Sequence, residues 1–96
     1  MNREEILQAL QRFKNFKAGV YQIEKIGIFG SIARNQASEK SDVDVVVLLK
    51  KQDLFNIIGI KQDLEETLQS PVDVVSYREN MNKYLKSRID DEALYV

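Results

Sequence analysis

The hydrophobic positions near the start of the chain repeat with the period of an α-helix. A helix is predicted from Asn2 to about Lys17, and one of its faces carries Ile6, Leu7, Leu10 and Phe13. Asn2 and Glu5 have the spacing of a capping box, in which each side chain accepts a hydrogen bond from the other residue's backbone. Gly19 suits a C-terminal stop for this helix.

Three shorter hydrophobic runs have the length and composition of β-strands. The first lies within residues 21–29 and is followed by Gly30. The second, Val43 to Leu49, is apolar at nearly every position, which predicts a central strand covered on both faces. The third, Val72 to Tyr77, follows Pro71, a residue that also ends the preceding helix.

Two further helices are predicted in the second half of the chain. One runs from about Leu54 to Gln69, is capped by Gln52 or Asp53, and has an inner stripe of Leu54, Ile57, Ile58, Lys61, Leu64 and Leu68. Phe55 and Ile60 fall off this stripe and are candidates for contact with a partner. The last helix runs from Asn80 to about Ile89 with Met81, Leu85 and Ile89 turned inward, and residues 90–96 carry no clear pattern.

The alternation of helices and strands predicts an α/β (α+β) fold in a single domain of residues 1–96. If Gly30-Ser31 and the acids Asp42 and Asp44 form one site, the first two strands run antiparallel. If Asp73 joins them, the second and third strands are parallel and joined by a crossover helix. The expected architecture is a small mixed β-sheet of three or more strands with helices packed on it.

Composition narrows the chemistry that this chain can perform. It has 96 residues, no Cys and no His, so thiolate metal sites, imidazole bases and Ser-His triads are excluded. The net charge of −1 does not indicate the basic surface that nucleic-acid binding requires, so direct nucleic-acid binding is not expected. No hydrophobic run has membrane-spanning length and the N-terminus lacks a signal-peptide pattern, so a cytoplasmic protein without membrane contact is expected.

A glycine and a serine follow the first predicted strand. With Ser31 as N-cap, a short helix is expected from Ile32 to about Ala37. Gly30 lets backbone or ligand approach closely, because it has no Cβ. A strand end, a glycine and a helix start form a phosphate-binding arrangement, since free N–H groups and the helix dipole face one spot.

Acidic residues stand at the starts of the second and third strands. Asp42 and Asp44 are two residues apart, so in a strand both carboxylates leave the same face. Asp44 lies in a strand that is otherwise apolar, where an unpaired carboxylate is costly, and Asp73 repeats the pattern. Such oxygen ligands suit Mg²⁺ or Mn²⁺, which bind a few carboxylates together with substrate phosphates.

Several polar residues near these positions have simpler explanations. Arg34 has two equally weighted interpretations, contact with a phosphate or an ion pair with a nearby acid. Ser41 is assigned to a turn and Lys40 to a solvated position. The basic residues of the last helix, Lys83, Lys86 and Arg88, are assigned to a solvated face, with a partner or phosphate patch as the second interpretation.

The combined pattern resembles a known family. Gly-Ser, ten residues and then Asp-x-Asp before an apolar strand is the signature of the DNA polymerase beta nucleotidyltransferase superfamily, and the sequence is most similar to its minimal nucleotidyltransferases, the short MNT proteins of bacteria and archaea. GSIAR, SDVDVVV and PVDVV occur in the expected order, and the resemblance covers essentially the whole chain. One departure is Asn35, where many relatives carry Gly, and it is expected to alter a turn rather than the chemistry.

The resemblance implies a polymerase-beta-type nucleotidyltransferase fold and a role for each matching residue. Asp42 and Asp44 would bind two Mg²⁺ ions, or Mn²⁺, together with the nucleotide triphosphate. Asp73 would complete the metal site and help deprotonate the acceptor hydroxyl, so the three acids are the implied catalytic and metal-binding residues. Gly30 and Ser31 would hold the β- and γ-phosphates, with Arg34 a further candidate for nucleotide binding.

Three functions are compatible with this resemblance. The first is a Mg²⁺-dependent protein adenylyltransferase, which transfers AMP from ATP to a Tyr hydroxyl of a HEPN-domain ribonuclease toxin and acts as its antitoxin. The second is a non-catalytic antitoxin that neutralises its partner by contact, although such a binder has no use for three clustered carboxylates. The third is a nucleotidyltransferase for a small hydroxylated molecule, whose relatives usually carry an extra domain for the acceptor.

Overall fold

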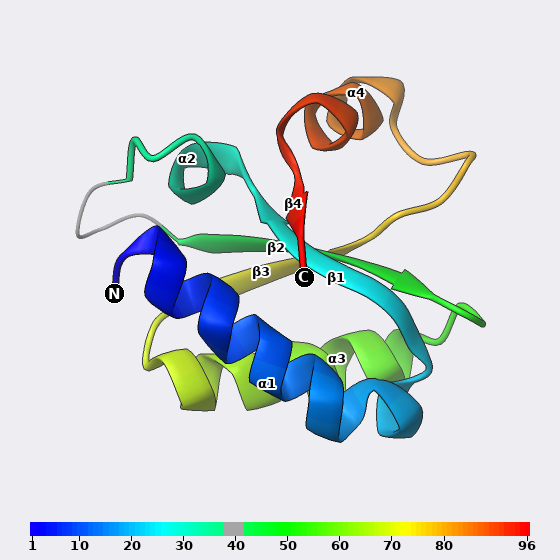
Figure 1. Ribbon diagram of the computed structural model, residues 1–96. Helices are drawn as coiled ribbons and strands as arrows, with labels where there is room; N and C mark the ends of the chain where they lie inside the picture. Colours follow the sequence, from blue (N-terminus) through cyan, green and yellow to red (C-terminus); the bar gives the residue numbers. More distant parts are fainter. Residues whose placement is uncertain (38–41) are drawn as a thin grey trace.

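The chain folds into a mixed β-sheet with helices on both faces, as seen in a computed structural model that describes residues 1–37 and 42–96. Figure 1 follows the elements along the chain. In order they are α1 (Arg3–Tyr21), β1 (Ile23–Phe29), α2 (Gly30–Ala33), β2 (Val43–Leu49), α3 (Leu54–Leu68), β3 (Val72–Ser76), α4 (Lys83–Glu92) and β4 (Leu94–Tyr95).

The sheet has four strands in the order β3-β2-β1-β4. β1 pairs with β2 antiparallel and β2 pairs with β3 parallel, which confirms both orientations predicted from a shared site. β4 is an addition that the sequence pattern did not indicate, and it pairs antiparallel with β1. The mixed α/β architecture is therefore confirmed, with one strand more than the three that were predicted by position.

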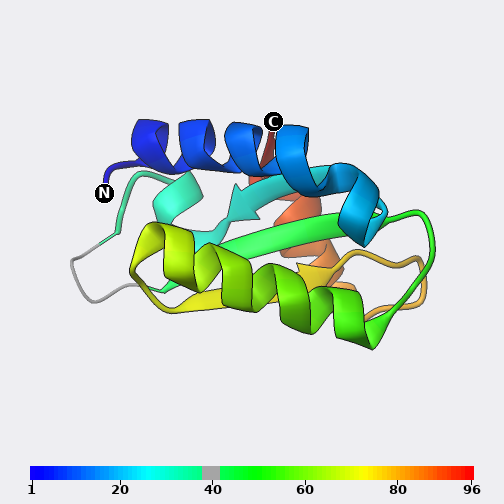
Figure 2. The ribbon, with the colours of Figure 1, turned by 90° about the horizontal axis from the view of Figure 1, so that it is seen from below.

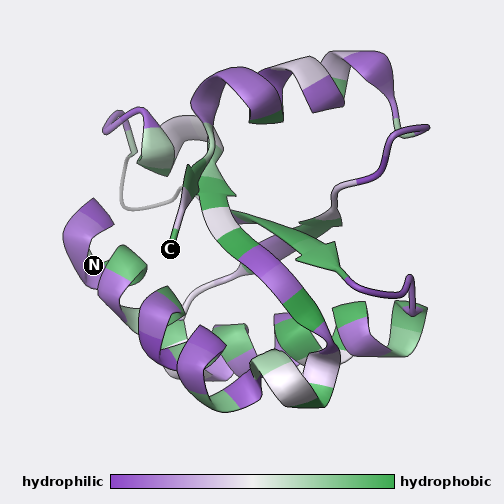
Figure 3. Cartoon of the chain, turned by 45° about the vertical axis from the view of Figure 1, so that its right-hand side comes forward, coloured by the Kyte–Doolittle hydropathy of each residue, from purple (hydrophilic) through white to green (hydrophobic). Residues whose placement is uncertain are grey.

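The central strand β2 is covered on both faces, as its apolar composition predicted. α1 and α3 lie side by side on one face, and α4 covers the other (Figures 1 and 2). Val43, Val45 and Val47 pack into the core under α1 and α3. Val46, between them in sequence, packs on the α4 side with a second cluster that contains Phe29, Met81 and Ile89. The alternation follows from the pleat of a strand, and Figure 3 shows green, hydrophobic segments along the strands between the helices.

α1 begins as predicted and ends later than predicted. Asn2 and Glu5 form the capping box, with both reciprocal hydrogen bonds present. Gly19 does not stop the helix, because α1 continues to Tyr21 and ends at Gln22, which adopts φ 59° and donates its N–H to the Ala18 carbonyl. The left-handed position that commonly ends a helix is thus filled here by a glutamine, three residues beyond the glycine.

α3 is capped by Asp53, one of the two expected residues, but its buried stripe differs from the prediction. Ile60 is fully buried, whereas Leu54 is 71% exposed and Ile58 is 42% exposed. Ile60 therefore packs into the core, where Lys61 was predicted to lie. The buried face of α3 is accordingly rotated about the helix axis relative to the predicted face. Lys61 instead donates to the Val72 carbonyl at the edge of β3.

α2 is a single turn and does not match the predicted helix of residues 32–37. Phe29 occupies the N-cap position and makes no side-chain capping bond, so the assignment of Ser31 as N-cap was wrong. The turn ends at Arg34, and Asn35 follows with φ 60°. A positive φ is easiest for glycine and next easiest for asparagine, so Asn35 is suited to this position of the turn.

The C-terminal segment begins its helix three residues later than predicted. Asn82 caps α4 by accepting from the Leu85 amide, while Met81 is buried just before the helix. β4 then lies so close to β1 that a Cβ at Gly27 would stand 2.4 Å from the Leu94 carbonyl oxygen. Within residues 1–37 and 42–96, no helix combines the length and the apolar character that crossing a membrane requires.

Candidate active site

Gly30 and Asp44 are in direct contact at the end of β1. Gly30 adopts φ +77°, and a Cβ at this position would lie 2.3 Å from Oδ2 of Asp44. The absence of a side chain therefore creates the space in which the Asp44 carboxylate lies. The preceding residue, Phe29, is the register partner of Asp44 in the antiparallel pair of β1 and β2.

The parallel pairing of β2 and β3 brings a second predicted acid beside the first. Asp44 is the register partner of Asp73, so their Cα atoms lie opposite each other on neighbouring strands. Both alternate with valines of the α1 and α3 core, Val43 and Val45 on β2 and Val72 and Val74 on β3. Asp44 and Asp73 therefore leave the sheet on the face that α4 covers.

The three predicted acids differ in their exposure. Asp44 is half-buried, while Asp42 and Asp73 are exposed. Burial raises the pKa of the Asp44 carboxyl group, and the negative charges of Asp73, Asp42 and Glu92 raise it further. Arg88 acts in the opposite direction and lowers the pKa of Asp44. Negative charge is thus concentrated at one end of the sheet, where a cation would relieve it.

The chemistry of these side chains fits a divalent cation that binds oxygen ligands. Among the residues that the structure describes, no three acidic side chains form a ready-made cage for a metal ion. Mg²⁺ does not require one, because it commonly binds through one or two carboxylates and completes its shell with water and substrate phosphates. Asp44, with Asp42 and Asp73 beside it, is the group that would hold such an ion.

The predicted phosphate-binding residues lie next to this carboxylate. Ser31 is half-buried in the turn α2 directly after Gly30. Its contact with phosphate, like that of Gly30, stays a prediction. Lys40 and Ser41, assigned from the sequence to a solvated position and a turn, lie outside the described residues.

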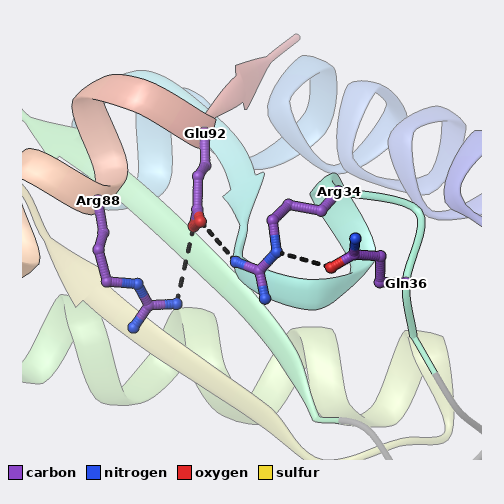
Figure 4. Close-up of polar contacts among 4 residues, drawn as sticks. All are labelled: Arg34, Gln36, Arg88 and Glu92. Atoms are coloured by element: carbon purple, nitrogen blue, oxygen red, sulfur yellow. Dashed lines mark hydrogen bonds and ion pairs between the residues drawn. The ribbon is translucent and has the colours of Figure 1, made fainter.

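Arg34 forms the ion pair that was one of its two interpretations. Its Nη1 donates to Oε2 of Glu92, and its Nε donates to Oε1 of Gln36 at 3.2 Å. Glu92 also faces Arg88, whose Nη2 lies 3.7 Å from Oε1 of Glu92. Figure 4 shows this group, with the two guanidinium groups on either side of one carboxylate.

The assignment of the basic residues on α4 to a solvated face was wrong for two of the three. Arg88 is half-buried and its guanidinium lies 5.9 Å from the centre of the Phe29 ring. Lys86 is also half-buried, beside Glu79 and over the Tyr77 ring. Only Lys83 is exposed. The spacing of Arg88 and Glu92, four residues apart, was the one sequence signal that could have indicated their pairing.

Comparison with known proteins connects this arrangement to a family. Residues 4–95 match the family described as polymerase beta, nucleotidyltransferase. A Methanocaldococcus jannaschii protein assigned as a protein adenylyltransferase is 33% identical over 93 residues, which span 96% of this chain and 95% of that protein. Protein adenylyltransferase MntA of Thermococcus cleftensis is 31% identical over 94 residues, which span 97% of this chain and 94% of that protein.

Solved structures show the same fold. A structure described as a minimal nucleotidyltransferase superposes with a TM-score of 0.78 at 28% identity, covering 98% of this chain and 95% of that one. One chain in a complex of a tri-AMPylated Shewanella oneidensis HEPN toxin with an MNT antitoxin superposes with a TM-score of 0.72 at 19% identity, covering 97% of this chain and 70% of that one. The chain therefore belongs to the polymerase beta nucleotidyltransferase family, among the minimal nucleotidyltransferases whose named relatives are protein adenylyltransferases.

Proposed function

We propose that the chain is a Mg²⁺-dependent protein adenylyltransferase that transfers AMP from ATP to a Tyr hydroxyl of a HEPN-domain toxin, and that it thereby acts as an antitoxin. The observation that carries this proposal is the position of Asp44. Its half-buried carboxylate lies against Gly30 and is the register partner of Asp73 on the neighbouring strand. A chain that only needed to bind its partner would gain nothing from this concentration of negative charge.

The reaction assigns a task to each predicted residue. The acceptor oxygen forms a bond to the α-phosphorus of ATP, the bond from that phosphorus to the bridging oxygen breaks, and pyrophosphate leaves. Asp73 is exposed beside Asp44 and accepts the hydroxyl proton as the new bond forms. Gly30 and Ser31 bind the β- and γ-phosphates, and Arg34 neutralises part of their charge.

Asp42, Asp44 and Asp73 are the residues that would hold the metal ions. When bound, two Mg²⁺ ions supply charge neutralisation for the entering and leaving oxygens. The carboxylates serve this role because Mg²⁺ prefers oxygen ligands, and Mn²⁺ could replace it. The chain contains no His or Cys, so a carboxylate is the proposed general base at this end of the sheet.

The partner is proposed from the proteins that share this fold. The structural relative, an MNT antitoxin, is in complex with a tri-AMPylated HEPN toxin of Shewanella oneidensis. The sequence relative from Thermococcus cleftensis is named a protein adenylyltransferase. We propose the same kind of partner and modification for this chain, and a cytoplasmic location because ATP is the donor.

The proposal is tested by incubating the protein with ATP, Mg²⁺ and the HEPN-domain protein proposed as its partner. Transfer is measured by mass spectrometry of the partner, with the modified residue mapped by peptide sequencing. The expected result is an AMP adduct on a tyrosine and loss of the partner's ribonuclease activity. The Asp42→Asn/Asp44→Asn variant should transfer AMP on the order of a hundredfold more slowly or worse.

A charge-matched control separates the site from a general effect of net charge. Glu66→Gln/Asp91→Asn removes two exposed acids from other parts of the surface and should transfer AMP at the wild-type rate. If the two proteins bind but no adduct forms with any nucleotide or divalent metal, the enzyme proposal fails. Inhibition of the ribonuclease by contact alone would then be the remaining explanation.

A further inference from the structure

Two charged residues of α4 face the candidate active site and have no role in the function proposed above. Arg88 and Glu92 are one helical turn apart, and α4 covers the face of the sheet from which Asp44 and Asp73 project. Arg88 and Glu92 lie more than forty residues along the chain from Asp44, so the fold alone places them here.

The position of Arg88 is fixed by an aromatic ring at the edge of the site. Its guanidinium lies 5.9 Å from the centre of the Phe29 ring, and Phe29 is both the register partner of Asp44 and the residue before Gly30. A cation over an aromatic face keeps its edge free for hydrogen bonds, because the ring contacts only its plane.

Glu92 connects Arg88 to the other arginine at this end of the sheet. It accepts from Nη1 of Arg34 through Oε2, and Arg88 lies 3.7 Å from its Oε1 (Figure 4). The Glu92 side chain is only 17% exposed, and within the described residues its Oε1 is buried without a hydrogen bond. A buried carboxylate of this kind requires nearby cations, so Glu92 fixes two guanidinium groups rather than one.

The balance of charge indicates which ligand these arginines serve. Arg34, Arg88 and Glu92 together carry one net positive charge, while Asp42, Asp44 and Asp73 carry three negative charges when ionised. A guanidinium has five N–H donors in a planar fork that matches phosphate oxygens, and one shared carboxylate cannot satisfy the donors of two such groups. A phosphate chain that enters beside Gly30 would meet these donors.

We propose that Arg88 is a second phosphate-binding arginine, which contacts the triphosphate of the nucleotide, and that Glu92 is a positioning residue that holds it in place. This inference rests on the proposed function, because it names a further ligand of the same nucleotide. It also assigns a role to α4, which contributes none of the predicted site residues.

The test measures ATP binding to the protein by titration calorimetry in the presence of Mg²⁺, without any acceptor protein. Arg88→Gln should weaken ATP binding by about tenfold to a hundredfold, the range of a hydrogen bond to a charged group. Arg88→Lys should fall between wild type and Arg88→Gln, because it keeps the charge and loses the fork. Lys83→Gln, which removes a positive charge from an exposed position of the same helix, should bind ATP like wild type.

A double-mutant cycle tests the positioning role of Glu92. If Glu92 holds Arg88 in place, the loss of ATP affinity caused by Arg88→Gln should be several-fold smaller in a Glu92→Gln background than in wild type. An equal loss in both backgrounds would show that Glu92 does not position Arg88. Thermal unfolding of each variant without ATP establishes that the compared proteins are folded.

The outcomes distinguish this inference from the proposed function. If wild type binds ATP and Arg88→Gln binds it equally well while remaining folded, Arg88 is not a phosphate ligand and the proposed function is unaffected. If wild type binds no nucleotide, both proposals fail together. A weakened Arg88→Gln with an unchanged Lys83→Gln supports the inference.

Discussion

Gly30 combines two requirements in one residue, a positive φ and the space for the Asp44 carboxylate. Ala in its place would adopt a strained backbone at φ +77° and would put a Cβ 2.3 Å from Oδ2 of Asp44. We expect Gly30→Ala to lower the free energy of unfolding by about 1–2 kcal/mol. It should also slow AMP transfer by about a hundredfold, because displacing a ligand by one ångström commonly has that effect.

These two effects are measured by urea unfolding and by the transfer assay on the same preparation. A Gly30→Ala protein with wild-type stability and wild-type transfer would show that the contact with Asp44 does not constrain the site. Partial loss of stability with full activity would show that the carboxylate moves without consequence for the reaction.

The Tyr21 hydroxyl makes the free energy of unfolding depend on pH in the alkaline range. It donates to Oδ2 of Asp63 at 2.6 Å, and this bond is the main cause that raises the pKa of Tyr21 from 10.0 to about 12. Because the folded-state pKa is the higher one, the stabilisation is fully present below pH 10 and is lost as pH rises from 10 towards 12. We expect Tyr21→Phe to destabilise by about 1 kcal/mol at neutral pH.

The pH profile of urea unfolding separates this effect from a loss of packing. The difference in stability between wild type and Tyr21→Phe should be constant up to about pH 9 and should shrink above pH 10. Tyr84→Phe, at a tyrosine that is 75% exposed, serves as the control for removing a hydroxyl and should follow wild type. A difference that stays constant to the highest pH would exclude the hydrogen bond to Asp63 as its source.

At the scale of the helices, two glycines inside α1 and α3 have opposite surroundings. A Cβ at Gly19 in α1 would meet nothing within 4 Å, whereas one at Gly59 in α3 would lie 2.7 Å from Cε1 of Tyr21. Gly19→Ala should therefore stabilise the protein by up to about 1 kcal/mol, the difference in helix propensity. Gly59→Ala gains the same propensity but displaces the Tyr21 ring and should be destabilising.

Thermal unfolding of the two variants provides the comparison, with Gly59→Ala repeated in a Tyr21→Phe background. If Gly59 exists to admit the Tyr21 ring and its bond to Asp63, Gly59→Ala should cost less once that bond is absent. Stabilisation by both Gly→Ala changes would mean that the packing of α1 against α3 tolerates the extra methyl group.

Helices and strands with a long hydrophobic pattern could be predicted from the sequence. The residues at which they begin and end could not. β2 was predictable because its alternate residues pack into hydrophobic cores on opposite faces of the sheet. Nearly every position in the strand is therefore apolar. The end of α1 was not, since Gln22 occupies the left-handed position that Gly19 could have taken. β4 has only two residues, Leu94 and Tyr95, and so short a strand carries no period at all.

For the molecule as a whole, the strand directions followed from the hypothesis that Gly30-Ser31 and the three acids share one site. The proximity of Gly30, Asp44 and Asp73 could be predicted because each of them interrupts an apolar segment, where such a residue is unusual. Arg88 and Glu92 could not, because an arginine and a glutamate on a short polar helix are typical of a solvated surface. Only the packing of α4 on the sheet brings them to the carboxylates.

The attachment of this C-terminal segment has a consequence for its dynamics. Ile89 is the one fully buried residue of α4, and β4 pairs with β1 at Gly27 and Ile28, with a further backbone hydrogen bond from the Val96 N–H to the Ile26 carbonyl. Such a segment is expected to open at a lower free energy than the β1–β2 pair, so its amides should exchange with deuterium first. Opening would carry Arg88 and Glu92 away while Asp44 and Asp73 stay in the sheet. The apparent affinity for ATP would then scale with the closed fraction, and ATP in turn would slow exchange throughout α4.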